Sequence, residues 1–85
     1  MRKIKKSRSF DKDFKKHGLS ENLIEALYHL IHEQPLPEKY RDHALAGNFK
    51  GYRDCHIRPD LVLIYRLTDD AVELHMLDSH SEIFG

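Results

Sequence analysis

The sequence has a single cysteine, Cys55, and no long run of apolar residues. One cysteine cannot form an internal disulfide, and this usage fits the reducing cytoplasm. No apolar run approaches the roughly 20 residues that a membrane-spanning helix needs, and the basic N-terminus lacks the apolar core of a signal peptide. We therefore expect a cytoplasmic protein that does not bind membranes.

Positive charge is missing from residues 68–85, which hold five acidic residues and no Lys or Arg. Residues 1–17 hold eight Lys or Arg against two aspartates, so the net charge of zero balances a basic end against an acidic one. A basic segment is compatible with a polyanionic partner, and it is equally compatible with a solvated helix face. Charge alone leaves both interpretations open.

The N-terminal half predicts one strand and two helices. Residues 2–6 resemble an edge strand, where lysines discourage aggregation. A helix capped by Ser7 or Ser9 follows and ends at Gly18. A second helix begins at Ser20, and its apolar stripe follows the 3, 4, 7 spacing. The stripe consists of Leu23, Ile24, Leu27, Leu30 and Ile31.

The C-terminal half predicts three strands joined by short turns. They span residues 49–57, 61–67 and 72–76, after a loop or short helical turn over 38–48 and before a polar tail over 78–85. The order is therefore β-α-α-β-β-β in one α+β domain of residues 1–85. We expect an antiparallel meander with both helices packed on one face and the other face open.

The first of these strands carries many groups that move protons or hold positive charge. If residues 49–56 are extended, alternate side chains share the open face of the sheet. This row consists of Lys50, Tyr52, Asp54 and His56. Arg53 then lies on the opposite face unless a bulge intervenes, so it is either a ligand contact or a structural ion-pair partner.

Four blocks of sequence occur together. They are Leu36-Pro37-x-x-Tyr40-x-Asp42-His43-x-Leu45-x-Gly47, Lys50-Gly51-Tyr52-Arg53-Asp54-Cys55-His56-Ile57-x-Pro59-Asp60, Leu63-Ile64-Tyr65-Arg66-Leu67 and His80-x-x-x-Phe84-Gly85. In this combination the chain resembles the YafQ branch of the RelE/ParE superfamily, which are toxins of bacterial type II toxin–antitoxin pairs. The resemblance covers essentially the whole chain.

The resemblance implies a small RelE-like α+β fold with a twisted antiparallel sheet. It also implies an endoribonuclease that inhibits translation by cutting mRNA, in most members while the mRNA sits on the ribosome. We expect the reaction to need no cofactor or metal. The implied partners are a cognate antitoxin that blocks the toxin, and operator DNA only for the toxin–antitoxin complex. The site residues that carry over by motif are His43, Asp54, His56, Asp60, His80 and Phe84.

Metal-free RNA cleavage needs a base for the 2′-hydroxyl, an acid for the leaving 5′-oxygen and cations for the charge on phosphorus. We expect His80 to be the general acid, because a flexible tail can bring it to the leaving group. His43 and His56 are candidates for the base or for phosphate contact. Asp60 is either a base or an orienting group, and Asp54 is expected to fix a histidine tautomer.

Further residues are expected to bind RNA. Lys50 and Arg53 are candidates for transition-state charge, while Tyr52 and Phe84 could stack on unpaired bases. The basic helix fits contacts with RNA phosphate through Lys12, Lys15 and Lys16.

Three alternatives remain at this point. A ParE-like toxin would bind DNA gyrase without catalysis, and such a protein needs no histidine cluster. A metal-dependent nuclease is conceivable because aspartate and histidine are metal ligands, although the spacing matches no established zinc pattern. A plain binding module would engage only a protein partner, and replacing His80 would then leave toxicity unchanged.

Overall fold

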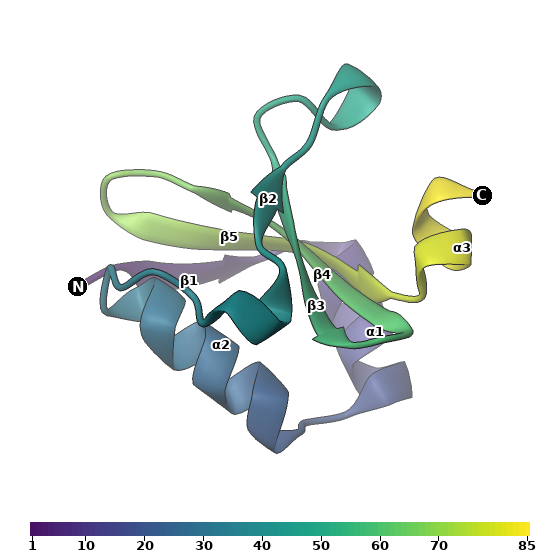
Figure 1. Ribbon diagram of the computed structural model, residues 1–85, viewed down its shortest axis with the longest axis horizontal. Coiled ribbons are helices and arrows are strands. Elements are labelled where there is room, and N and C mark those ends of the chain that lie inside the picture. The colour runs from purple at the N-terminus through teal and green to yellow at the C-terminus, as the bar shows by residue number, and fades with distance from the viewer.

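A five-stranded sheet forms the centre of the structure, a computed structural model that describes residues 1–85 (Figure 1). Its regular elements are β1 (Lys3–Lys6), α1 (Arg8–His17), α2 (Glu21–Ile31), β2 (His43–Ala44), β3 (Arg53–Arg58), β4 (Leu61–Leu67), β5 (Ala71–Asp78) and α3 (His80–Phe84). Two short 3-10 helices, η1 (Glu38–Tyr40) and η2 (Gly47–Phe49), flank β2. No helix has the length and apolar character that crossing a membrane requires.

The strand order is β1-β5-β4-β3-β2. The antiparallel meander of β3, β4 and β5 is confirmed, as is the edge position of β1. The resemblance implied an antiparallel sheet, but the sheet is mixed, because β1 pairs with β5 in parallel, with Lys3 opposite Ala71 and Lys6 opposite Leu74. This pairing brings together residues 3–6 and residues 71–74. Its direction depends on segments far apart in the sequence, so no local pattern encodes it.

Serine caps set where the two main helices begin. The Ser7 hydroxyl accepts a hydrogen bond from the Phe10 backbone N–H at 2.9 Å, so Ser7 rather than Ser9 is the cap of α1. The Ser20 hydroxyl accepts one from the Leu23 N–H at 3.2 Å in the same way. Gly18, with φ 76°, ends α1 as expected, since this left-handed conformation costs glycine little.

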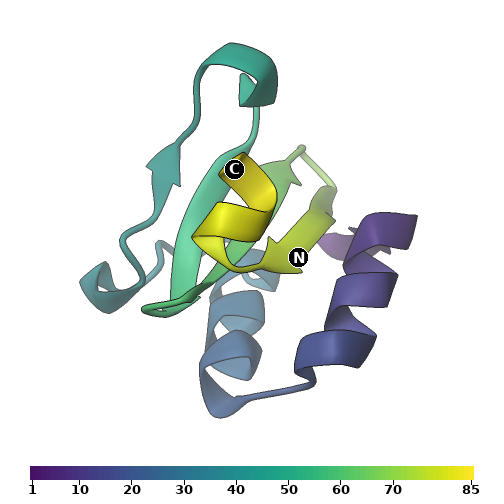
Figure 2. The ribbon, with the colours of Figure 1, turned by 90° about the vertical axis from the view of Figure 1, so that its right-hand side faces the viewer.

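Both helices cover one face of the sheet, as predicted (Figure 2). The core between the two layers contains apolar side chains from α1, α2 and the three central strands. It includes Phe10, Leu23, Leu30, Cys55, Leu63, Tyr65 and Leu74. The predicted apolar stripe of α2 is wrong at Ile24, which is 51% exposed and points away from this core.

The predicted strand over residues 49–57 is too long at its N-terminal end. The chain forms η2 and then turns at Gly51, which has φ 93°, before β3 begins at Arg53. Lys50 and Tyr52 therefore do not continue the strand row of Asp54 and His56. Instead, the loop around η2 rises away from the sheet on the side opposite the two helices (Figure 1).

The C-terminal tail is a helix rather than the irregular polar segment that the sequence suggested. Ser79 caps α3 by accepting a hydrogen bond from the Glu82 N–H at 3.2 Å. A serine with a glutamate three residues later is the capping-box pattern, which was overlooked in so short a segment. The helix begins with His80 directly after β5, beside the open face of the sheet (Figure 2).

Candidate active site

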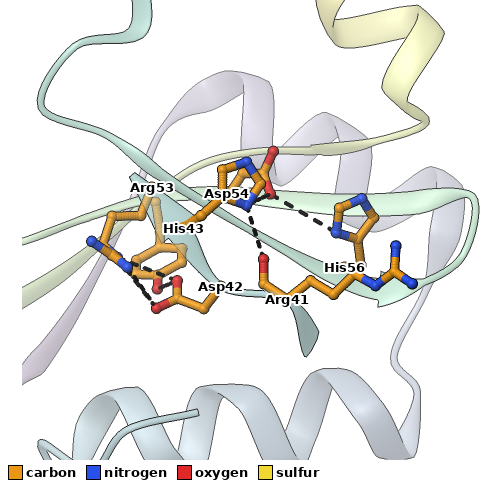
Figure 3. Close-up of polar contacts among 7 residues, drawn as sticks. Arg41, Asp42, His43, Arg53, Asp54 and His56 are labelled. Carbon is orange, nitrogen blue, oxygen red and sulfur yellow. Dashed lines mark hydrogen bonds and ion pairs between the residues drawn. The ribbon is translucent and has the colours of Figure 1, made fainter. Parts of the chain in front are cut away.

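The candidate site lies on the face of the sheet that the two main helices leave open. Asp54 and His56 are two residues apart on β3 and therefore project from the same face, opposite to the core residue Cys55. The two-residue strand β2 pairs with β3 so that His43 lies directly across from Asp54. This register brings three of the predicted site residues together (Figure 3).

The Asp54 carboxylate lies between the two histidines. Its Oδ1 is 3.4 Å from Nδ1 of His43 and 4.0 Å from Nδ1 of His56. The two imidazole rings are stacked with their centroids 6.5 Å apart. Both rings remain accessible, the His43 side chain being 52% exposed and that of His56 25% exposed. The arrangement presents two imidazoles to solvent over one buried carboxylate.

The Asp54 carboxylate is buried, and one of its oxygens lacks the hydrogen bond that would offset the loss of water. The residue is only 2% exposed, and its Oδ1 has no hydrogen-bond partner. Burial raises the pKa of the Asp54 carboxyl, while positive charge on His43, His56 and His80 acts in the opposite direction. The facing Nδ1 of His56 is also buried and unpaired. Unpaired buried polar atoms are uncommon, and two facing each other point to a functional site.

A backbone carbonyl fixes the tautomer of His43. Its Nδ1 lies 2.9 Å from the carbonyl oxygen of Arg41. A carbonyl oxygen can only accept a hydrogen bond, so Nδ1 carries the proton. In the neutral ring Nε2 then keeps its lone pair and can accept a proton from a ligand.

An ion pair on the other side of β2 holds this strand in place. The Asp42 carboxylate accepts a hydrogen bond from Nη2 of Arg53 at 2.9 Å (Figure 3), and it also accepts one from the hydroxyl of Tyr65. Arg53 lies opposite Tyr65 in the β3–β4 register, so its side chain is on the helix-covered face. Of the two roles that the sequence left open for Arg53, the structure shows the ion pair.

Aromatic residues connect α3 with the η2 loop. The Phe84 ring is 4.7 Å from that of His80 and 5.3 Å from that of Phe49. Phe49 also contacts His75, which in turn lies 4.8 Å from the ring of Tyr52. His80 itself is exposed at the first position of α3. These rings offer a surface on which unpaired bases can stack.

Two other predicted site residues lie apart from this cluster. Asp60 is exposed in the turn between β3 and β4, and its side chain forms no hydrogen bond or ion pair. It borders a shallow hollow with Arg58 and Ser79, the residue before His80. Lys50 is exposed on the η2 loop. Their predicted roles toward RNA stay predictions.

The three predicted RNA-binding lysines of α1 are exposed. Lys12 and Lys16 border a hollow of about 350 Å³ that Ile83 of α3 also lines. Lys16 is 3.6 Å from the Asp78 carboxylate, so part of its charge is used within the protein. The basic helix therefore lies beside α3, and Lys15 has no ion-pair partner.

The geometry offers no multidentate metal site. No group of three or more His, Cys, Asp or Glu side chains is placed to share one ion. Asp54 with two histidines comes nearest in composition, but the histidines present the same nitrogen, Nδ1, to a single carboxylate oxygen. The residues present therefore do not fit a resident metal ion in this arrangement.

Sequence reasoning missed several residues around the site. Arg41 holds His43 through its carbonyl, Asp42 anchors β2, and Phe49 contacts Phe84. The conformation of Arg41 is left-handed, with φ 48°, which is uncommon for a residue with a side chain. The adjacency of Asp42 to His43 was the one visible hint, since both stand in the same sequence block.

Comparison with known proteins shows that the chain matches a known protein family. A family model described as a bacterial toxin of type II toxin–antitoxin system, YafQ, matches residues 2–85. The mRNA interferase toxin YafQ of Escherichia coli K12 is 39% identical over 99% of this chain and 97% of its own length.

Solved structures agree with this match. A copper-bound mutant toxin from Helicobacter pylori has a TM-score of 0.92 and 42% identity, covering 99% of this chain and 100% of its own. The DinJ–YafQ complex of E. coli contains a chain with a TM-score of 0.86 and 39% identity, with both chains covered completely.

Proposed function

This chain belongs to the YafQ family of bacterial toxins from type II toxin–antitoxin systems, and on that premise we propose that it is an mRNA interferase, an endoribonuclease that inhibits translation. The observation that carries the proposal is the buried Asp54 carboxylate facing two accessible imidazoles. The Oδ1 atom of a buried structural aspartate would be hydrogen-bonded, whereas that of Asp54 is not. Exposed imidazoles beside a buried carboxylate are the groups that acid–base cleavage of RNA requires.

RNA carries its own nucleophile, so the protein needs only to move protons and stabilise charge. A base takes the proton of the 2′-hydroxyl, whose oxygen then attacks the adjacent phosphorus and displaces the 5′-oxygen. An acid donates a proton to that leaving oxygen. The products are a 2′,3′-cyclic phosphate and a free 5′-hydroxyl. Imidazole suits both proton transfers because it titrates near neutral pH.

His43 is the general base in this proposal. Its Nδ1–H donates to the Arg41 carbonyl, which leaves Nε2 free to take the 2′-hydroxyl proton. The Asp54 charge beside it stabilises the imidazolium that forms. Asp60 is the alternative base, since its carboxylate is exposed and unpaired. Comparing His43→Gln with Asp60→Asn distinguishes the two assignments.

His80 is the general acid in this proposal. It stands on the short helix α3, which lies beside the open face of the sheet (Figure 2), and from there it can approach the leaving oxygen. Phe84, packed against both His80 and Phe49, supports this helix and offers a face for a base. His56 contacts the phosphate between the two proton-transfer groups.

We further propose that the chain is held inactive by a cognate antitoxin, as a toxin of a type II pair. The E. coli relative has been solved in complex with DinJ. In the same proposal the chain acts in the cytoplasm on ribosome-associated mRNA, and it meets operator DNA only together with its antitoxin. The lysines of α1 contribute phosphate contacts along the RNA.

The decisive test is cleavage of a defined mRNA by the purified protein in EDTA, with and without ribosomes. Wild type and a His32→Gln control, which changes an exposed histidine of the α2 C-terminus, should cleave equally. His80→Gln should lose about 10²–10⁴-fold in rate. Growth arrest in cells by both wild type and His80→Gln, without cleavage, would overturn the nuclease proposal and redirect attention to a protein target such as gyrase.

A metal-dependent reaction is the second candidate, because the H. pylori relative is described as copper-bound. The Asp54 cluster of this chain does not place three ligands around one ion. EDTA should therefore leave cleavage unchanged. Loss of cleavage on chelation, with recovery on adding copper or zinc, would favour the metal reaction instead.

A further inference from the structure

A cleft of about 400 Å³ lies beside His56, on the side of α2 and η1. It is lined by Asn22, Lys39, Tyr40, Arg41, His56, Ile57, Arg58 and Pro59. We call it the arginine cleft, because Arg41 and Arg58 contribute its permanently charged groups together with Lys39. The Arg41 side chain extends toward His56 (Figure 3). None of the lining residues is an aspartate or a glutamate.

The two arginines carry charge that the protein does not neutralise. Neither guanidinium forms an ion pair or hydrogen bond within the chain, whereas Arg53 and Arg66 are both paired with carboxylates. Lys39 is partly neutralised by Glu25, 3.2 Å from its Nζ. Unpaired guanidiniums around a concave surface attract anions, and their planar forks match phosphate oxygens.

The walls of the cleft are held by contacts that do not involve these charges. Asn22 donates a hydrogen bond from its side-chain amide to the Ile57 carbonyl at 2.8 Å, which ties α2 to the end of β3. The buried Tyr40 donates to Glu25 at 2.6 Å and fixes η1 on α2. Arg41 follows in the left-handed conformation. The cleft is therefore preformed, which lowers the entropic cost of binding a ligand.

We propose that the arginine cleft binds a second phosphate of the RNA strand, next to the phosphate that is cut. This inference rests on the proposed function, because His56 then contacts the scissile phosphate from one side and borders the cleft on the other. When one phosphate of the RNA lies at the histidines, the next phosphate is one nucleotide further along the RNA. The cleft is the cationic surface beside the histidines that can receive it. The ligand class is a phosphodiester of single-stranded RNA.

A binding experiment tests the cleft independently of catalysis. Single-stranded deoxynucleotides lack the 2′-hydroxyl and cannot be cut, so a trinucleotide and a dinucleotide can be compared by NMR titration. The trinucleotide, which carries one more phosphate, should bind about tenfold tighter to the wild type and shift the Nε–H signals of Arg41 and Arg58. The difference should vanish in the Arg41→Gln/Arg58→Gln variant. Equal affinities for both probes in the wild type would overturn the cleft as a phosphate site.

Cleavage kinetics then test its use on RNA. The double variant should raise KM about tenfold or more with little change in kcat, and it should lower the slope of log KM against log salt by about one. Lys3→Gln is the matched control, because Lys3 is an exposed, unpaired cation on β1 at the opposite edge of the sheet and should change neither value.

The outcomes separate the two proposals. Unchanged KM in the double variant, together with weaker antitoxin binding, would overturn the RNA subsite and assign the cleft to acidic residues of the antitoxin. Absence of RNA cleavage by the wild type would count against the proposed nuclease. In that case the deoxynucleotide titration still decides whether the cleft holds phosphate.

Discussion

The protein pairs aspartate with histidine in two places, and the two places are built differently. At the end of α1, His17 donates from Nε2 to the Asp78 carboxylate at 2.9 Å, and the Ser79 N–H donates to the same oxygen at 2.9 Å. On the open face of the sheet, Asp54 faces His43 at 3.4 Å, and its Oδ1 receives no hydrogen bond. We refer to them as the closed pair, Asp78–His17, and the open site, Asp54 with His43 and His56.

The pKa values of the two carboxyl groups are shifted in opposite directions. Burial alone would raise the pKa of Asp78, but the hydrogen bonds from His17 and from the Ser79 backbone, together with Lys16, bring it below its ordinary value. Burial raises the pKa of Asp54, and no hydrogen bond to Oδ1 compensates. A satisfied pair stabilises a fold, whereas an unsatisfied one costs stability and is retained where it has a function.

The largest expected effect is on RNA cleavage, and it separates the two histidine environments. His43→Gln removes the proposed base from the open site and should lower the cleavage rate by about 10²–10⁴-fold. His17→Gln is the matched change in the closed pair and should leave the rate within about twofold, because His17 only anchors α1 to β5. Rates can be compared on the same mRNA at one enzyme concentration. Equal losses in both variants would show that the open site has no special role.

A second prediction concerns what holds the open site in position. Asp42→Ala removes the partner of Arg53 and Tyr65 and should destabilise the protein by about 2 kcal/mol. Cleavage should also fall about tenfold in kcat, because β2 no longer holds His43 opposite Asp54. Glu73→Gln serves as the control, since it breaks the exposed Arg66 pair and should cost less than about 1 kcal/mol. Urea unfolding measures both. A wild-type kcat in the Asp42 variant would remove the positioning role.

Local patterns were enough to predict most of the fold. The serine caps, Gly18 and the apolar stripe located α1 and α2, and alternation located β4 and β5, because short-range spacing determines these elements. The start of β3 could not be predicted in this way. The chain turns at Gly51, whose φ of 93° is left-handed, inside the stretch that was predicted to be extended. A glycine in the sequence shows that the chain is free to turn there, but it does not show that the turn occurs.

The open site was predicted in composition but not in geometry. The family resemblance identified His43, Asp54 and His56, yet only the β2–β3 register shows that His43 lies across from Asp54. Which side chains of β3 share a face could be predicted, because side chains alternate between the two faces along Arg53–Arg58. Arg41 could not be found, because its carbonyl contact and positive φ depend on how η1 packs against α2. Long-range contacts of this kind leave no periodic trace in the sequence.

The third prediction is that neutralising the two aspartates changes stability with opposite signs. Asp54→Asn removes a buried charge whose Oδ1 has no hydrogen-bond partner, and it should raise the free energy of unfolding at neutral pH by about 1 kcal/mol while cleavage is lost. Asp78→Asn weakens a charge-assisted hydrogen bond to His17 and should lower it by about 1 kcal/mol while cleavage persists. Urea unfolding of both variants beside the wild type checks the signs. Destabilisation by Asp54→Asn would mean that the histidines already compensate its charge.

The smallest effects are in the pH dependence of stability, where the two carboxyl groups should act in different windows. The ordinary pKa of an aspartate is 3.8, and the folded pKa of Asp78 lies below this value. The contribution of Asp78 to stability is therefore complete above pH 3.8 and is lost as the pH falls through the lowered pKa. The folded pKa of Asp54 lies above 3.8, so the contribution of Asp54 to stability is most favourable below pH 3.8 and declines as the pH rises through the raised pKa.

Unfolding of the wild type and both Asn variants between about pH 2 and pH 7 should therefore give two difference curves. The Asp54→Asn curve should match the wild type in acid and rise above it at pH values higher than 3.8, whereas the Asp78→Asn curve should fall below the wild type while the pH is still lower than 3.8. Two curves of the same sign would show that the open site and the closed pair are energetically alike, and the functional distinction between them would then rest on exposure alone.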